Sequence, residues 1–504
     1  MEMTIGYCLM RSAWKFADKT AIVFEGTRIT YDQLNRRVNR LANALLRLGV
    51  KKGDKIASML FNSPEIIEAY YAAAKIGAIT IPINFRLVWR EVEYIIDQSE
   101  ARVFIYDAGL RNIIEKYSTS KGLSLISVGE NSYPDSFNYE ELITDSTDLE
   151  VEVSISEDDL RLIMYTSGTT GLPKGAMFTH KNNLWSGLLI ILAKKHYYDD
   201  IVLIVNPLFH MNSYANLIAS VFMGNTMVVM KKFDALEMMK LIESETVTIT
   251  SIVPTIGKRL LEASKDHHFN LESWKYCSCT GSAWTFEMKK SFMERFPRLI
   301  IGDAYGATEF SSGTLIEGHE MMNRPKSVGK PYVDVMMRII DDRNNDCLPG
   351  QVGEILVRGP HVTQGYYNNP EATGQALQNG WYYTGDLGYF DEDGYLFFVD
   401  REKDKIVSGG ENIYTLEVEK TLLDHEDIEE AAVIGVPDDE WGKVLKAYIV
   451  PSKSAKIGHD EVINFCKENL ASFKKPRYIE FVESLPKNAM GKVLKEALRK
   501  RSEK

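Results

Sequence analysis

Hydrophobic residues recur at helical spacing near the start of the chain. Between residues 31 and 50, leucine or valine stands at positions 34, 38, 41, 45 and 48, and glycines follow at 49 and 53. Steps of three and four residues place an apolar stripe along one face of an α-helix, and glycine commonly follows the last turn. The pattern predicts an amphipathic helix that ends near residue 50.

Short apolar runs and helical segments alternate through the next part of the chain. Strand-like runs cover residues 56–60, 79–83, 102–106 and 124–128, and a second helix is predicted over residues 64–75. Alternation of this kind is typical of parallel sheets whose faces are covered by helices. The amino-terminal part of the chain is therefore expected to be α/β.

The pattern changes after residue 350. Glycines come often between residues 353 and 394 and separate short strand-like runs such as 354–357 and 395–399, which predicts a small antiparallel or barrel-like unit. Residues 413–504 have the pattern of a compact α+β domain. Its expected elements are helices near 416–423 and 459–470 and strands at 430–436 and 444–450. The charged stretch 401–406 divides the two parts, so we place the domain boundary at residues 400–403.

Length, composition and charge narrow the function classes. A chain of 504 residues favours two or three domains, and 45% hydrophobic with 26% charged residues is ordinary globular composition. The net charge of −11 disfavours a general affinity for nucleic acid or anionic membrane. The amino-terminus lacks a basic segment before an apolar run, and no stretch of roughly 18 uncharged apolar residues occurs. A cytoplasmic location is therefore expected.

Two local features qualify this picture. From Lys474 to the end, ten Lys or Arg residues and four Glu residues give a basic segment in an acidic protein. The five cysteines are scattered, and the Cys277–Cys279 pair without a second pair or a nearby His is weak as a zinc site. We expect buried or incidental thiols.

The string Y-T-S-G-T-T-G-L-P-K-G at 165–175 carries the strongest chemical signal. It directly follows the strand-like run 160–164. Glycines let a backbone approach a polyanion, hydroxyl and amide groups donate to phosphate oxygens, and Lys174 supplies positive charge. A Walker loop is absent because Lys174 is followed by Gly175. Composition alone leaves open a flexible Ser/Thr/Gly turn.

Seven further segments occur in the order of one known family. They are P-L-F-H at 207–210, G-S-A at 281–283, D-A-Y-G-A-T-E at 303–309, W-Y-Y-T-G-D-L-G at 381–388, D-R-E-K-D at 400–404, S-G-G-E-N-I-Y at 408–414 and P-K-N-A-M-G-K at 486–492. Together with the 165–175 string, they resemble the motifs of the AMP-forming adenylate enzymes, which include acyl-CoA synthetases, peptide-synthetase adenylation domains and beetle luciferases. The resemblance extends over the whole chain.

The resemblance implies a fold and a division of labour. The expected fold is a large amino-terminal domain (1–400) of two parallel-sheet α/β subdomains with a small β-barrel-like subdomain. A small, mobile α+β domain (401–504) follows, with a hinge near Lys403. The large domain is expected to bind ATP and the acid, and the small domain to carry the catalytic lysine and the CoA side. ATP, Mg²⁺ and CoA are the implied cofactors, a small carboxylic acid the substrate, and a monomer or homodimer the assembly.

Residue roles follow from the same resemblance. The expected phosphate-binding residues are Thr166, Ser167, Gly168, Thr169, Thr170, Gly171 and Lys174. The expected adenine-binding residues are Gly281, Ser282, Ala283, Asp303, Ala304, Tyr305, Gly306 and Thr308. Asp386 and Arg401 are expected at the ribose, and Thr166 and Glu309 at Mg²⁺, which prefers hard oxygen ligands. Lys403, Gly409 and Gly410 are expected at the hinge and along the path of the CoA thiol arm.

Lys492, His210 and Glu309 are the expected catalytic residues. When a carboxylate attacks the α-phosphate of ATP, two anions meet, and the Lys492 ammonium would stabilise the charge that spreads over the oxygens. His210 is expected to position the acyl group. Amino-acid-activating relatives place Asp there, so an α-amino acid substrate is disfavoured.

The acid itself is predicted only as a class. The segments around Trp185, 210–214, 281–284 and Gly306 are largely apolar or aromatic, which suits an acyl or aryl tail. They contain no Arg, which disfavours a dicarboxylate, and Trp284 is expected to shorten the pocket. A short- to medium-chain fatty or aryl acid is therefore predicted. After G-E-N-I-Y, Thr415 replaces a frequent Pro and is expected to cap a helix start.

An acid:CoA ligase is the leading interpretation of these motifs. One alternative is an adenylate-forming enzyme that loads a carrier protein or another acceptor. Another is a non-catalytic nucleotide sensor, which the presence of Lys492, Glu309 and Asp386 disfavours.

Overall fold

The amphipathic helix predicted at the start of the chain forms between Tyr31 and Arg47 (α2) in the computed structural model. Its predicted apolar stripe is buried from Leu34 to Leu45. The Thr30 hydroxyl accepts from Gln33 N, and the Gln33 side chain accepts from Thr30 N, which satisfies two amides at the helix start.

The structure describes residues 2–115, 122–130, 133–166, 173–281, 284–408, 411–438, 442–452, 457–471, 474–487 and 493–502. The chain divides into two units. The larger unit comprises Met1–Met336 and Val357–Tyr382, and the smaller unit comprises Met337–Leu356 and Tyr383–Lys504. The predicted hinge near Lys403 stays a prediction.

One sheet of the larger unit has the strand order β7-β6-β5-β3-β4-β8-β9. Its strands are β3 (Lys55–Met59), β4 (Ile79–Pro82), β5 (Ala101–Asp107), β6 (Ser124–Val128), β7 (Phe137–Asn138), β8 (Leu160–Thr166) and β9 (Lys174–Thr179). All neighbouring pairs are parallel except β8 and β9, which are antiparallel. Its helices are α3 (Pro64–Lys75), α4 (Trp89–Ser99), α5 (Arg111–Ile114) and α6 (Tyr139–Thr144). The predicted parallel alternation is confirmed here.

The second sheet of the larger unit has the order β16-β15-β14-β13-β12-β10-β11-β1-β2. Its strands are β1 (Thr20–Phe24), β2 (Thr27–Thr30), β10 (Ile201–Ile204), β11 (Thr226–Val229), β12 (Ile249–Ile252), β13 (Tyr276–Cys279), β14 (Ile300–Tyr305), β15 (Thr314–Glu317) and β16 (Lys330–Pro331). Strands β14, β13, β12, β10, β11 and β1 are parallel to their neighbours within that run. Further helices of the larger unit are α1 (Ile5–Lys15), α7 (His180–Lys194), α8 (Met211–Met223), α9 (Ala235–Ser244), α10 (Pro254–Asp266), α11 (Phe286–Arg295) and α12 (Glu320–Asn323).

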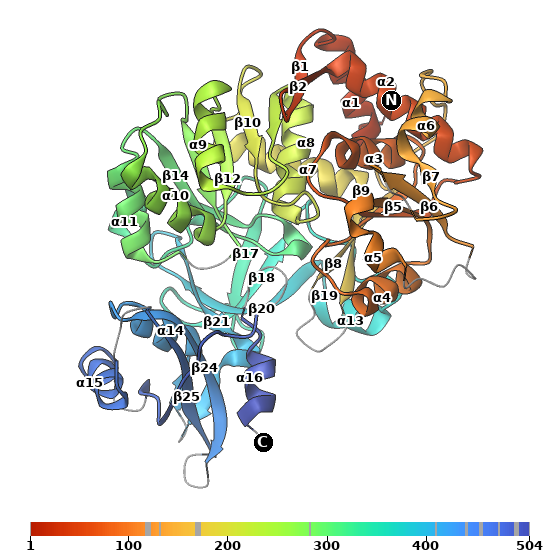
Figure 1. The fold of residues 1–504 in the computed structure, drawn as a ribbon. Helices are drawn as coiled ribbons and strands as arrows, with labels where there is room; N and C mark the ends of the chain where they lie inside the picture. The colour runs from red at the N-terminus through yellow and green to blue at the C-terminus, as the bar shows by residue number, and fades with distance from the viewer. Residues whose placement is uncertain are drawn as a thin grey trace. The chain divides into compact units, whose positions relative to one another are not determined.

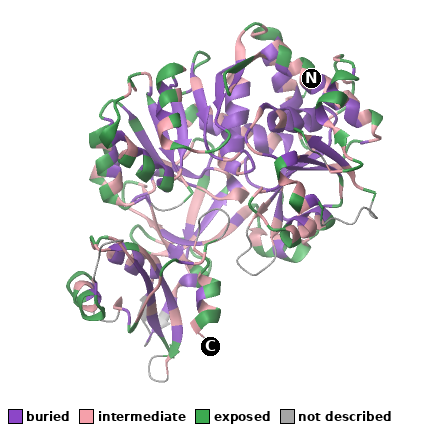
Figure 2. Cartoon of the chain, viewed as in Figure 1, coloured by how far each residue is buried: buried purple, intermediate pink, exposed green. Residues whose placement is uncertain are grey.

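Helices α7 and α8 lie between these two sheets (Figure 1). Helix α7 contacts β8 and β9, and α8 contacts β10 and β11. The strands and the helices between them are mostly buried (Figure 2). Both helices are therefore part of the core between the sheets.

A smaller sheet of five strands follows, as the glycine-rich segment predicted. Its members are β17 (Met336–Ile340), β18 (Gly353–Arg358), β19 (Leu377–Gln378), β20 (Trp381–Phe390) and β21 (Leu396–Arg401), with α13 (Pro370–Ala376) before β19. Strand β20 is antiparallel to both β19 and β21.

The α+β character predicted for the end of the chain is confirmed. The elements are β22 (Ile406–Ser408), β23 (Glu411–Ile413), α14 (Thr415–Leu423), β24 (Ile428–Asp438), β25 (Gly442–Pro451), α15 (His459–Asn469), β26 (Tyr478–Phe481) and α16 (Lys495–Ser502). Strand β25 lies between β24 and β26.

The start of α14 is capped differently from the prediction. The Asp400 carboxylate accepts from Leu416 N at 3.1 Å and from the Thr415 hydroxyl at 2.9 Å. Thr415 is the first residue of the helix rather than its N-cap. Asp400 therefore caps α14, and the expectation that Thr415 caps it was wrong.

Candidate functional site

Several predicted motifs follow parallel strands of the second sheet. P-L-F-H follows β10, Gly281 follows β13, and the Y-G-A-T-E segment begins at the end of β14. Because the carboxyl ends of parallel strands meet at one edge of a sheet, the fold brings these distant segments together. This edge is the candidate site of the larger unit.

Backbone packing explains the glycine that follows β14. A Cβ on Gly306 would lie 2.1 Å from the carbonyl oxygen of Ser311, so no larger residue fits without moving the loop. The loop then forms a short helical turn, η3 (Thr308–Phe310), which carries Glu309. The close approach therefore fixes where the Glu309 carboxylate is presented.

Tyr366 connects Glu309 with the end of the phosphate-loop motif. The Tyr366 hydroxyl donates to Glu309 Oε1 at 3.0 Å, and the Lys174 ammonium lies 5.4 Å from the centre of the Tyr366 ring. Thr166 and Lys174 are in register at the ends of β8 and β9. Glu309, Thr166 and Lys174, which are predicted to bind ATP and Mg²⁺, are thus connected through Tyr366 and through the pairing of β8 with β9. Tyr366 was missed by sequence reasoning because none of the motifs includes it.

Asp303 has a partner that the sequence did not reveal. Its carboxylate accepts from the ammonium of Lys289 at 2.5 Å, and both residues are buried. A buried ion pair orients the carboxylate within the sheet. The predicted contact of Asp303 with adenine stays a prediction.

His210 is the N-cap residue of α8 and is partly buried. Its ring centre lies 4.3 Å from that of Phe209, which packs against Phe85. Burial, with a smaller effect of the Arg86 charge, lowers the pKa of His210 to about 4. The imidazole is therefore neutral at pH 7.

The predicted ribose residues lie together in the smaller unit. Asp386 on β20 and Arg401 on β21 are in register, and Arg401 Nε lies 3.5 Å from Asp386 Oδ1. Asp386 is 7% exposed. A carboxylate held by strand pairing can accept from two hydroxyl groups of a ribose. Lys403 is exposed.

The remaining predicted positions divide into two groups. Ala304, Tyr305 and Thr308 lie on or just after β14, where the motif order predicted them. Ten predicted residues lie outside the described residues: Ser167, Gly168, Thr169, Thr170, Gly171, Ser282, Ala283, Gly409, Gly410 and Lys492.

The residue predicted to shorten the acyl pocket is buried among helices. The Trp284 ring centre lies 5.4 Å from that of Phe292 on α11. The pocket length stays a prediction.

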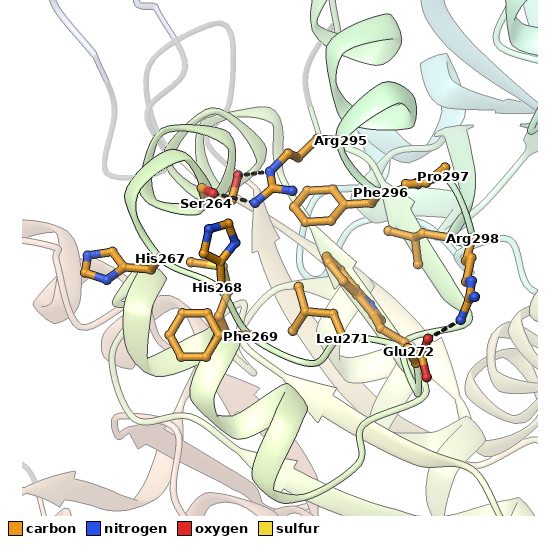
Figure 3. Close-up of a pocket in the computed structure, with 13 residues that line it drawn as sticks. Ser264, His267, His268, Phe269, Leu271, Glu272, Arg295, Phe296, Pro297 and Arg298 are labelled. Carbon is orange, nitrogen blue, oxygen red and sulfur yellow. Dashed lines mark hydrogen bonds and ion pairs between the residues drawn. The ribbon is translucent and has the colours of Figure 1, made fainter.

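A cavity of about 230 Å³ lies elsewhere on the second sheet (Figure 3). Its wall includes His268, Phe269, Glu272 and Arg298, from the segments that precede β13 and β14. These segments enter the strands at their amino ends, opposite the edge where the motifs meet. This cavity is therefore separate from the candidate site.

Comparison with protein families gives two matches that together cover most of the chain. Residues 9–367 match the AMP-binding enzyme model, and residues 417–492 match the AMP-binding enzyme C-terminal domain. In the part of the chain that the structure describes, no helix is long and apolar enough to cross a membrane.

Full-length relatives are similar to this chain. It is 34% identical over 499 residues to a feruloyl-CoA synthase of Amycolatopsis sp, with 99% of each chain covered. It is 35% identical over 504 residues to a 2-succinylbenzoate–CoA ligase of Oceanobacillus iheyensis, covering 99% of this chain and all of the relative.

Solved structures agree with these matches. The o-succinylbenzoate CoA synthetase from Bacillus subtilis in complex with its acyl-adenylate intermediate has a TM-score of 0.90 and 31% identity, covering 99% of this chain and 98% of that one. The same synthetase with ATP and magnesium ion has a TM-score of 0.87 and 31% identity, covering 97% and 98%.

Proposed function

Because this chain belongs to the family of AMP-binding enzymes and is an AMP-forming acid:CoA ligase, we propose that its substrate is a short- to medium-chain fatty acid or an aryl acid. The observation that carries the activity is the match to CoA ligases over nearly the full length of both chains. ATP, Mg²⁺ and CoA are its cofactors.

In the first step, the acid carboxylate attacks the α-phosphorus of ATP, and pyrophosphate leaves. The Glu309 carboxylate and the Thr166 hydroxyl are hard oxygen donors and fit Mg²⁺, whose charge stabilises the phosphates. Lys174 would contact phosphate, and Asp386 with Arg401 would hold the ribose. The Lys492 ammonium would stabilise the charge that develops during the transfer.

In the second step, the CoA thiol attacks the acyl carbonyl, a thioester forms, and AMP leaves. Gly409 and Gly410 would let the thiol arm pass the backbone, and Lys403 would be the hinge between the two steps. Neutral His210, at the start of α8, would position the acyl group. The cytoplasmic location and the monomer or homodimer stay predictions.

A screen of carboxylic acids for pyrophosphate release, with and without CoA, tests this proposal. The enzyme is expected to release pyrophosphate with short, medium or aryl acids and to form a thioester only when CoA is present. Highest turnover on acids of 16 or more carbons would contradict the proposed substrate class. Pyrophosphate release without any thioester from CoA would favour a carrier-protein acceptor.

Lys492→Ala is expected to slow adenylate formation by about 100-fold or more, because it removes a cation from the transferring phosphate. Lys500→Ala, which removes an exposed cation from the same basic segment, is the control and is expected to leave the rate unchanged. Unchanged adenylate formation in Lys492→Ala would overturn the assignment of Lys492.

A further inference from the structure

Lys194 is a buried lysine that has no carboxylate partner among the described residues. It is the last residue of α7 and is 5% exposed. Its ammonium donates to Asn216 Oδ1 at 2.6 Å and to Ser251 Oγ at 2.5 Å. Among the described residues, no carboxylate lies within 4.0 Å of Lys194 Nζ, and its third N–H has no acceptor. Burial lowers the pKa of Lys194 to about 7.

The other two buried lysines among the described residues are each paired with a carboxylate. Lys75 lies 2.6 Å from Glu150, and Lys289 lies 2.5 Å from Asp303. A buried charge costs free energy unless it is paired and hydrogen-bonded. Within the described part of the chain, Lys194 has only neutral partners, so those residues do not compensate its charge.

The partners of Lys194 belong to a larger group of buried side chains. Ser251 on β12 and Ser278 on β13 are in register, with their hydroxyl oxygens 2.7 Å apart. Asn206 donates to the carbonyl of Ser251, and Ser213 donates to the carbonyl of Asn206. We call this group the buried polar cluster; its members are Lys194, Asn206, Ser213, Asn216, Ser251 and Ser278.

The buried polar cluster adjoins the candidate site. Asn206 precedes His210 by four residues, and Asn216 lies in the second turn of α8, which His210 begins. Six residues of helix correspond to about 9 Å along the axis. Ser251, Ser278 and Gly302 form a row of small residues across three parallel strands. Through its bond to Asn216, Lys194 therefore lies within about two helical turns of His210.

A small cavity already lies within the buried polar cluster. Its volume is about 10 Å³, and Asn206, Ser213, Asn216 and Ser251 contribute to its wall. This space corresponds to about one water molecule, and its wall offers polar partners. The aliphatic residues 202–205 complete the wall, so the space is part polar and part apolar.

We propose that Lys194 is a specificity-determining residue that binds an oxygen-bearing group, either a second carboxylate or a phenolic hydroxyl, at the far end of the acid. This inference rests on the proposed acid:CoA ligase function and narrows its substrate class. The sequence disfavoured a dicarboxylate because its pocket segments contain no Arg. Lys194 lies outside those segments, so that expectation did not take its charge into account.

The test uses the full-length enzyme and matched acids. Cinnamic acids with hydrogen, methyl, hydroxyl or carboxylate at the ring carbon opposite the side chain are compared by kcat/KM for pyrophosphate release. The wild type is expected to prefer the hydroxyl or the carboxylate over methyl by about tenfold or more, since a buried polar group rejects a ligand that leaves it unpaired. Of the hydroxyl- and carboxylate-substituted acids, the one with the larger kcat/KM shows which oxygen-bearing group Lys194 binds.

Lys194→Met is expected to abolish that preference and to retain activity with the methyl-substituted acid. Lys195→Met is the matched control, because Lys195 is exposed and adjacent in sequence, and it is expected to keep the wild-type preference. Asn216→Asp is a second variant of nearly unchanged size. Its carboxylate would compete for the ammonium and lower the preference for a carboxylate tail about tenfold, even if Lys194→Met fails to fold.

The outcomes separate this inference from the proposed function. A wild-type enzyme that prefers methyl would overturn the role of Lys194 and leave the ligase function intact. An equal loss of kcat/KM on all four acids in both Lys194→Met and Asn216→Asp would also overturn the role of Lys194 and leave the ligase function intact. No pyrophosphate from any acid, cinnamic or aliphatic, would overturn the proposed function and this inference with it.

Discussion

At the residue scale, Tyr366 is the position where the structure adds most to the proposed adenylation site. Its hydroxyl donates to Glu309, which is predicted to hold Mg²⁺ with Thr166. Tyr366→Phe keeps the ring beside Lys174 and removes that hydrogen bond. We expect about a tenfold rise in the Mg²⁺ concentration for half-maximal adenylation, since hydrogen bonds to charged groups contribute about 1.5–3 kcal/mol. A Mg²⁺ titration of pyrophosphate release measures this shift.

The neighbouring tyrosine provides the control for this substitution. The Tyr367 hydroxyl also donates to a glutamate, Glu100, at 2.8 Å, but Glu100 is exposed and distant from the predicted magnesium residues in sequence. Tyr367→Phe is expected to leave the Mg²⁺ dependence unchanged. If both variants shift it equally, or neither does, Tyr366 does not position Glu309.

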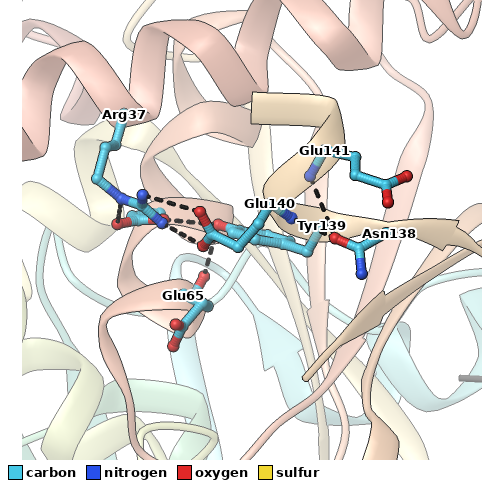
Figure 4. A network of polar contacts seen from close by, with 7 residues as sticks. Arg37, Glu65, Asn138, Tyr139, Glu140 and Glu141 are labelled. Carbon is cyan, nitrogen blue, oxygen red and sulfur yellow. Dashed lines mark hydrogen bonds and ion pairs between the residues drawn. The ribbon is translucent and has the colours of Figure 1, made fainter. Parts of the chain in front are cut away.

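At the element scale, Arg37 forms two ion pairs that join three helices of the larger unit (Figure 4). Arg37 on α2 donates to Glu68 on α3 at 2.6 Å and to Glu140 on α6 at 2.7 Å, and Tyr139 donates to Glu68 at 2.8 Å. Glu68 is fully buried. Arg37→Met is expected to lower the free energy of unfolding by about 3 kcal/mol, because it leaves a buried carboxylate without its cation. Urea unfolding measures the change.

Two variants sharpen the interpretation of Arg37→Met. Arg36→Met removes an adjacent arginine whose ion pair with Asp32 is exposed, and it is expected to cost less than about 1 kcal/mol. Adding Glu68→Gln to Arg37→Met is expected to recover part of the loss, because the unpaired charge disappears. Equal costs for Arg36→Met and Arg37→Met would show that burial of Glu68 is unimportant.

The contact between α7 and α8 leads to a second prediction at this scale. A Cβ on Gly187 would lie 2.7 Å from Ile218 Cγ2 on α8, whereas a Cβ on Gly374 in α13 would meet nothing within 4 Å. Gly187→Ala is expected to destabilise by about 1–2 kcal/mol through overpacking. Gly374→Ala is expected to stabilise by about 0.5–1 kcal/mol, because alanine is the better helix former. A lower urea midpoint for Gly187→Ala and a higher one for Gly374→Ala, each relative to the wild type, would confirm both. A stabilised Gly187→Ala would contradict the close helix contact.

The hydrophobic pattern predicted individual helices and strands. It could not predict the buried polar cluster, because the members of that cluster are brought together by the order of strands in the sheet. The bounds of α3 and the parallel strands agree with the hydrophobic periodicity, because that periodicity records which face is buried. Lys194, Asn216, Ser251 and Ser278 come from four elements, and only the order β13-β12-β10 places them together. Thr415 shows the same limit, since its partner Asp400 lies 15 residues away on β21.

At the scale of the whole molecule, burial keeps several histidines neutral. Burial lowers the pKa of His180 to about 3 and those of His196, His210 and His361 to about 4. All four belong to the larger unit. Because an unfolded histidine takes up a proton near pH 6.5 and these folded ones do not, the unfolded state binds more protons between pH 6.5 and about 4. Each contributes stability that is present above pH 6.5 and is lost as the pH falls.

His180 allows this pH dependence to be measured for one group. Its Nδ1 accepts from Ile5 N at 3.2 Å, so protonation of that nitrogen would also break the contact between α7 and the start of α1. His180→Asn keeps an acceptor near the same position and removes the titration. The wild type is expected to lose up to about 1.4 kcal/mol per pH unit relative to His180→Asn between pH 6 and pH 4.5. Burial raises the pKa of Glu68 and of Glu419, so their contribution to stability changes with pH in the opposite direction. Because both proteins contain these residues, that contribution cancels in the comparison. Parallel stability curves for the two proteins from pH 7.5 to pH 4.5 would contradict a buried, neutral His180.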